Sequence, residues 1–238
     1  MVQPEFLALA VLLLFGGALY LAITGAKKDR EKKQARALQL GLEPLEHAPD
    51  ELLSRLEALH RSRKNQTLEA RQVYQEQGFD RQLYLFDLID THEEDSVLGR
   101  EMFGVISHNL ALPHFSMITL LPIDTDRLLG GLMERLMDRF FDWAGKFQQL
   151  QRITFPTAPD FEEQFVVFGR DPQALRKLFS GSAAAYLMGL DLPLMLAGSG
   201  DFLTVTLGYP QQDAAEDPLD QLRELYRETN QLVRLLES

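Results

Sequence analysis

The chain has 238 residues, of which 45% are hydrophobic and 25% are charged, with a formal net charge of −11 and no cysteine. This composition is ordinary for a globular protein and excludes collagen-like, fully disordered and disulfide-stapled folds. The lack of cysteine also excludes a thiol nucleophile and any cysteine-ligated zinc or iron–sulfur site. The acidic balance disfavours nucleic acid as a partner, because nucleic-acid binding relies on basic side chains that neutralise phosphates.

The strongest single signal is an apolar run near the start of the chain. Residues 6–23 read FLALAVLLLFGGALYLAI, and uncharged residues continue to residue 26, a span of 21 residues. At ~1.5 Å per residue such a helix is about 30 Å long, the thickness of the hydrocarbon core of a bilayer. We therefore predict a transmembrane helix over residues 6–26. A cleaved signal peptide is the alternative, but residues 1–5 carry no basic side chain and the run is longer than a usual signal.

The charges that follow this run predict its orientation. Residues 1–5 contain no basic side chain, whereas residues 27–36 contain six: Lys27, Lys28, Arg30, Lys32, Lys33 and Arg36. Basic flanks stay in the cytoplasm, so we expect residues 1–5 outside the membrane and the rest of the chain in the cytoplasm. We expect the same six side chains at the membrane surface, where each contributes about 1 kcal/mol of attraction to anionic headgroups. From residue 37 onward the net charge is −14, which would hold the body of the protein off an anionic membrane.

These features divide the chain into four parts: an extracytoplasmic N-terminus (1–5), a transmembrane helix (6–26), a basic helical stalk (27–64) and an acidic domain (65–238). Within the stalk we predict a helix that ends at Leu40 with Gly41 as its C-cap, a second helix over residues 50–59, and a polar joint over residues 60–65.

From Thr67 the hydrophobic pattern becomes strand-like. Runs over residues 68–76, 82–91, 97–107 and 115–121 are joined by short polar links, which predicts an antiparallel meander. Residues 82–90 are apolar on both faces, so we expect a central strand that is covered on both sides.

The second half of the chain alternates helices with short strands. We predict a long helix over residues 124–143, a strand over 165–168, a helix over 172–179 after the N-cap Asp171, and a hairpin of 194–197 with 202–207 around residues 198–200. A last helix begins after Asp217, and its apolar stripe indicates packing onto its own sheet or, alternatively, a dimer interface. The predicted fold class is therefore α+β, with a mostly antiparallel sheet and packing helices.

Three short segments carry a resemblance to other proteins. Leu83-Tyr84-Leu85-Phe86-Asp87, Leu112-Pro113-His114-Phe115-Ser116-Met117 and Phe165-Val166-Val167-Phe168-Gly169-Arg170-Asp171 occur in this order. Through these segments the chain resembles a bacterial group of small membrane-anchored proteins to which no activity is assigned. The resemblance extends over residues 65–236. The resemblance implies a bacterial inner-membrane protein and carries over no catalytic residue.

The search for catalytic motifs finds none. The chain lacks a dinucleotide-binding glycine motif, a P-loop, a Gly-x-Ser-x-Gly elbow and a His-Glu-x-x-His pair. His108 and His114 lie six residues apart across a proline, a spacing that does not bring two ligands together on one strand or helix. The acidic loop over residues 90–95 lacks the alternation of a calcium-binding loop. We therefore predict no enzymatic activity, no cofactor and no metal site.

Asp87 is the most informative single residue because it interrupts an apolar face. A buried carboxylate costs several kcal/mol unless a partner compensates it. One interpretation is an ion pair with Arg71 or Arg100 on a neighbouring strand. The other is a ligand-binding carboxylate that lines, with Tyr84, a pocket between the sheet and the helix over residues 125–143.

Two functions from different classes fit these features. The first is a membrane-anchored interaction or scaffold module whose partner is another protein. The alternative is a sensor that binds a small molecule or a lipid-derived ligand in a sheet–helix pocket. Ala18 and Ala22 form a small-x-x-x-small pair, which leaves a homo-oligomer possible.

Overall fold

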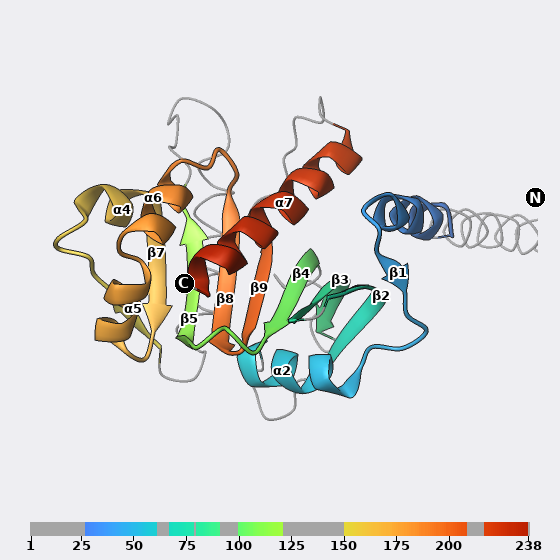
Figure 1. The fold of residues 1–238 in the computed structure, drawn as a ribbon, viewed down its shortest axis with the longest axis horizontal. Coiled ribbons are helices and arrows are strands. Elements are labelled where there is room, and N and C mark those ends of the chain that lie inside the picture. Colours follow the sequence, from blue (N-terminus) through green and yellow to red (C-terminus); the bar gives the residue numbers. More distant parts are fainter. Residues whose placement is uncertain are drawn as a thin grey trace, which may run out of the picture.

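The computed structural model describes residues 27–60, 67–78, 80–90, 100–120, 150–208 and 217–237 (Figure 1). Within them one antiparallel sheet of nine strands has the order β1-β2-β3-β4-β9-β8-β5-β7-β6, and every neighbouring pair is antiparallel. The strands are β1 (Glu43–Pro44), β2 (Leu68–Gln77), β3 (Arg81–Asp90), β4 (Arg100–Ser107), β5 (Leu112–Thr119), β6 (Gln151–Ile153), β7 (Phe165–Gly169), β8 (Leu194–Gly200) and β9 (Phe202–Leu207). The helices are residues 27–39, here called the stalk helix, α2 (Asp50–His60), α4 (Pro159–Gln164), α5 (Pro172–Leu178), α6 (Ser182–Met188) and α7 (Pro218–Leu236).

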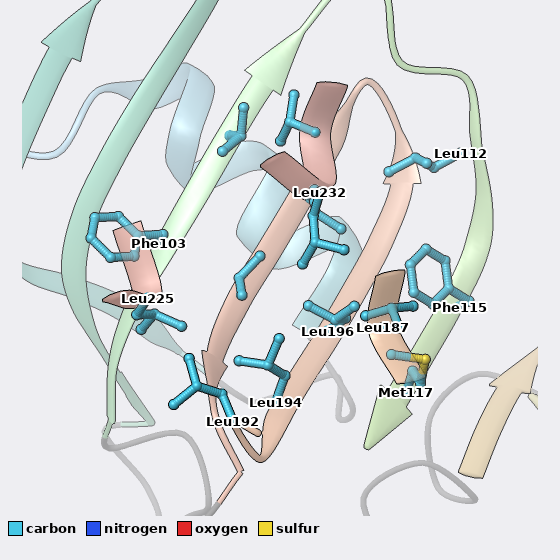
Figure 2. Packing of buried hydrophobic residues seen from close by; sticks show 14 of the residues in the cluster. Phe103, Leu112, Phe115, Met117, Leu187, Leu192, Leu194, Leu196, Leu225 and Leu232 are labelled. Carbon is cyan, nitrogen blue, oxygen red and sulfur yellow. The ribbon is translucent and has the colours of Figure 1, made fainter. Parts of the chain in front are cut away.

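Helices cover both faces of the sheet. The long helix α7, the short helices α4 to α6 and the end of the stalk helix pack on one face, and α2 packs on the other (Figure 1). On the first face Leu225 of α7 lies beside Phe103 of β4, and Leu232 of α7 belongs to the same core as Leu194 and Leu196 of β8 (Figure 2). The mixed α+β class, with a large antiparallel sheet and packing helices, is confirmed.

The central strand β3 explains how one sheet separates two cores. Leu83 and Leu85 point into the core under α7, whereas Tyr84 and Phe86 point into the core over α2. All four side chains are at most 2% exposed. Because successive side chains of a strand alternate between faces, a strand that is apolar throughout must be covered on both sides, as its sequence predicted.

The ends of the helices follow the predicted capping residues. Gly41 has a φ of +78°, and it ends the stalk helix. The amide of Gly41 donates to the carbonyl of Leu38, and the amide of Leu42 donates to that of Ala37, both at 3.0 Å, which is the Schellman pattern. The Asp171 carboxylate accepts bonds from two free amides at the start of α5, and the Asp217 carboxylate accepts one from Leu219 at the start of α7.

The order of the strands differs from the predicted meander. The meander holds for β2, β3 and β4, but β9 and β8 lie between β4 and β5. Residues 102–106 of β4 therefore pair with residues 202–206 of β9. The turn between β8 and β9 lies at Asp201, after Gly200 with a φ of +61°, so residues 198–200 belong to the strand. The short elements β1, β6, α4 and α6 were not predicted.

Some predicted segments lie outside the described residues: the transmembrane helix over 6–26, the helix over 124–143 and most of the acidic loop over 90–95. In the part of the chain that the structure does describe, none of the helices combines the length and the apolar character needed to cross a membrane. Of the predicted polar joint only His60 is described, and it is the buried last residue of α2. The predicted stalk is also part of the fold, because β1 pairs with β2 and α2 packs on the sheet.

Candidate functional site

The six basic residues that we expected at the membrane surface separate into two groups. Lys27, Lys28, Arg30 and Lys32 are exposed, whereas Lys33 is buried and Arg36 is half-buried. Lys33, Arg36, Ala37 and Leu40 recur at spacings of three and four residues, so one face of the stalk helix meets the body of the protein. Contact with lipid stays a prediction for the exposed residues, while Lys33 has a partner inside the fold.

That partner is Asp87. The Lys33 Nζ lies 2.6 Å from Oδ1 of Asp87 and 3.3 Å from Oε1 of Glu101, and only 6% of the Lys33 side chain is exposed. Arg36 approaches the same Glu101 carboxylate at 3.7 Å. Asp87 is thus a structural carboxylate in this arrangement. Its cation comes from the stalk helix and not from the predicted Arg71, which is exposed and binds Glu69.

The position of the two carboxylates shows why a cation is needed there. Asp87 of β3 and Glu101 of β4 are directly opposite each other in the sheet register. Like charges in this position repel and destabilise a strand pair. Lys33 contacts both carboxylates and Arg36 contacts Glu101, so the two cations of the stalk helix balance the two charges on the central strands.

The stalk helix also contacts the start of α7. Arg36 donates to the backbone carbonyl of Pro218, and Arg223 of α7 donates to the side chain of Gln39. Apolar contacts add to these bonds, because Ala37 and Leu42 are fully buried in the core that includes Tyr74 and Leu85. These contacts define how the stalk helix is attached to the sheet.

Tyr84 is not part of this cluster. It lies on the opposite face of β3, is 2% exposed, and donates its hydroxyl to Oε1 of Gln82 at 2.5 Å. Burial raises the pKa of the Tyr84 hydroxyl. The structure therefore separates Asp87 from Tyr84 by the thickness of the sheet, and the two do not share the predicted ligand pocket.

A pocket does occur between α7, α6 and the ends of β2 and β3. Its volume is about 610 Å³, and polar, aromatic and basic residues line it: Glu76, Arg81, Tyr186, Tyr226, Arg227, Asn230, Gln231 and Arg234. We call it the α7 pocket. None of these residues was predicted as a site residue, although Arg223, Arg227, Asn230 and Arg234 have the spacing of one helical stripe, and that signal is present in the sequence.

Fixed hydrogen bonds hold two tyrosines at this pocket. The Tyr226 hydroxyl donates to Oε2 of Glu76 at 2.7 Å, and the Tyr186 hydroxyl donates to the buried Glu228. Burial, followed by the bond to Glu76, raises the pKa of Tyr226 to about 12. Burial and the bond to Glu228 likewise raise the pKa of Tyr186. Both tyrosines therefore stay protonated at neutral pH and act as donors to acidic side chains.

A buried histidine lies on the other face of the sheet. His60 is 3% exposed, and its Nε2 lies 3.2 Å from the Thr204 hydroxyl. Burial, together with the charge of His114, lowers the pKa of His60 to about 3. Burial also lowers the pKa of His114. Across the described ranges, no group of three or more histidine, aspartate or glutamate side chains is arranged to hold a metal ion.

The fold and these sites define a mixed α+β protein with a docked basic helix and a polar pocket. No protein-family model matches the chain, and no curated protein sequence matches it. Among solved structures, the chain is similar to the crystal structure of the mycobacterial trehalose monomycolate transport factor A, TtfA. The identity is 12% and the TM-score is 0.48, over 87% of this chain and 95% of the other.

Proposed function

We propose that the protein is a single-pass bacterial inner-membrane protein. In this proposal residues 1–5 lie outside the membrane and residues 6–26 cross it, and the C-terminal body acts in the cytoplasm as an interaction or scaffold module for another protein. The observation that carries the proposal is the ion-paired attachment of the stalk helix, through Lys33, to the carboxylates of Asp87 and Glu101.

This attachment bears on function because it fixes to the body the residues that follow the expected membrane segment. The stalk helix is held on the sheet through Lys33 and the residues that follow it. A tethered module gains effective concentration toward partners near the same membrane, and a fixed attachment also limits which of its surfaces those partners meet. The exposed Lys27, Lys28, Arg30 and Lys32 remain available to anionic headgroups.

The topology is tested first. The chain has no cysteine, so Ser62→Cys introduces a single reporter beyond the stalk helix. Intact cells are treated with a membrane-impermeant maleimide, and the labelling is repeated after lysis. Protection in cells and labelling after lysis support a cytoplasmic body. Labelling in intact cells would place the body on the outer side and refute this topology.

The interaction role is tested on the full chain, extracted in a gentle non-ionic detergent after crosslinking in cells. We expect a complex larger than the protein alone that contains a second protein in constant ratio. Lys33→Met should reduce the yield of this complex because it loosens the stalk helix, whereas Lys32→Met, on the exposed side, should leave it unchanged. A protein that migrates alone under all these conditions would contradict the proposal.

A second candidate function is a sensor for a small molecule or a lipid-derived ligand. The α7 pocket favours it, since a volume of about 610 Å³ is within the range of small-molecule sites. This pocket is lined by other residues than Asp87 and Tyr84. A thermal-shift screen of the full chain against metabolites and short-chain lipids tests the candidate, which predicts that at least one compound stabilises the protein.

A further inference from the structure

We propose that the α7 pocket binds a small ligand through an anionic group, a carboxylate or a phosphate. The inference rests on the second candidate function, ligand sensing, and it names the class of ligand. The observation that carries it is the charge of the pocket lining, which is positive although the whole protein is negative.

Three arginines and one glutamate line the pocket, in a chain whose net charge is −11. Arg227 is neutralised, because it pairs with Glu228 at 2.7 Å and with Glu224 at 3.1 Å. Arg81 and Arg234 differ from it: within the described part of the chain, neither forms an ion pair with a carboxylate. One of these two arginines comes from the sheet and the other from α7, and both line the same hollow.

The acidic groups of the pocket are already engaged. Glu76 accepts the hydroxyl of Tyr226, and Glu228 accepts the hydroxyl of Tyr186 and the guanidinium of Arg227. These bonds hold the carboxylates in place. Glu76 keeps its charge, but Arg81 and Arg234 together outweigh it, which leaves a net positive charge for an anion from solution. The planar fork of a guanidinium matches the geometry of a carboxylate or a phosphate and binds either with two parallel hydrogen bonds.

Asn230 lines the pocket, but its amide is bonded within its own helix. Its Nδ2 donates to the carbonyl of Tyr226, while its Oδ1 is buried and has no hydrogen-bond partner in the described structure. A buried acceptor without a partner is costly, but this oxygen is closed to solvent, so it sets no requirement on a ligand in the pocket. The rings of Tyr186 and Tyr226 offer apolar surface to the remainder of such a ligand.

Anionic groups of this kind occur on soluble metabolites and on lipid headgroups, so the probes distinguish the two sources. The full chain in a non-ionic detergent is titrated by calorimetry with inorganic phosphate, succinate and dihexanoyl phosphatidic acid, and with glycerol as a neutral probe. We expect at least one of the anions to bind, with an affinity that falls as salt is added, and glycerol not to bind. Binding of succinate or phosphate indicates a soluble ligand, and binding of the short-chain lipid alone indicates a headgroup. Both outcomes support the proposal.

Variants locate the binding. Arg81→Gln and Arg234→Gln should each weaken it by about tenfold, the usual effect of losing one charge-assisted hydrogen bond. The matched control is Arg223→Gln, on the same helix, because Arg223 is exposed, pairs with Asp220 and does not line the pocket. The control should change the affinity by less than about twofold, which is the scale of a distant surface charge.

The proposal is overturned if no anion binds, or if the pocket variants bind as the control does. The thermal-shift screen separates this failure from that of the sensor function. If neutral compounds stabilise the protein while anions do not, the ligand class is wrong and the sensor function stands. If no compound of either kind stabilises it, both fail.

Discussion

Replacing Lys33 tests whether the stalk helix is an integral part of the fold. Lys33→Met keeps the length of the side chain and removes its charge, and it leaves Asp87 and Glu101 opposite each other without their buried cation. The variant should unfold at a clearly lower urea concentration than the unmodified chain. The neighbouring Lys32→Met, on the exposed side of the helix, should change stability by less than about 0.5 kcal/mol.

The magnitude follows from the burial of the pair. Removing one partner of a fully buried ion pair costs about 3–5 kcal/mol, because the remaining charge is left uncompensated. The Asp87 and Glu101 side chains are 24% and 26% exposed, so water and Arg36 screen part of their repulsion. We therefore expect a loss of about 2–3 kcal/mol after this discount.

A double-mutant cycle attributes the loss to this interaction. Asp87→Asn removes one of the two carboxylates that face Lys33, so Lys33→Met should cost less in its presence, by about 1–2 kcal/mol. Unfolding of the full chain in a non-ionic detergent is followed by far-ultraviolet circular dichroism. If Lys33→Met is as stable as Lys32→Met, or if the two effects simply add, the attachment of the stalk helix does not depend on this ion pair.

Three further predictions concern stability. The folded state lowers the pKa of His60 from 6.5 to about 3, so protonation of this histidine favours unfolding. Its contribution to stability is complete above pH 6.5 and is lost as the pH falls below that value. In His60→Gln the urea midpoint of unfolding should therefore depend less on pH between pH 6.5 and about 5, a range above the titration of the carboxylates. Gly104→Ala should lower the melting temperature and reduce the free energy of unfolding by about 1–3 kcal/mol, because the new Cβ would lie 2.9 Å from the ring of Phe86. The control is Gly189→Ala, which should be tolerated because the nearest atom to its Cβ is 3.5 Å away. Gly41→Ala should cost about 1 kcal/mol in the same melting assay, because its φ of +78° disfavours a side chain.

Local features of this fold could be read from the sequence. The Gly41 C-cap, the aspartate N-caps of α5 and α7, and the two apolar faces of β3 all act over a few residues, so the chain carries them wherever it folds. The pattern of α7 likewise indicated that it packs on its own sheet, and Leu222, Leu225, Leu232 and Val233 are buried there. The same kind of pattern could have indicated the basic stripe of α7.

Tertiary structure alone decided which distant segments meet. Residues 102–106 pair with residues 202–206, and β9 and β8 separate β4 from β5, because strand pairing depends on whole-sheet packing and not on nearby residues. The sequence identified Asp87 as a carboxylate that needs a cation, but the choice of Lys33 over Arg71 came from the attachment of the stalk helix. The α7 pocket arises in the same way, since Arg81 and Arg234 are far apart in the chain and line one hollow only once α7 lies across the sheet.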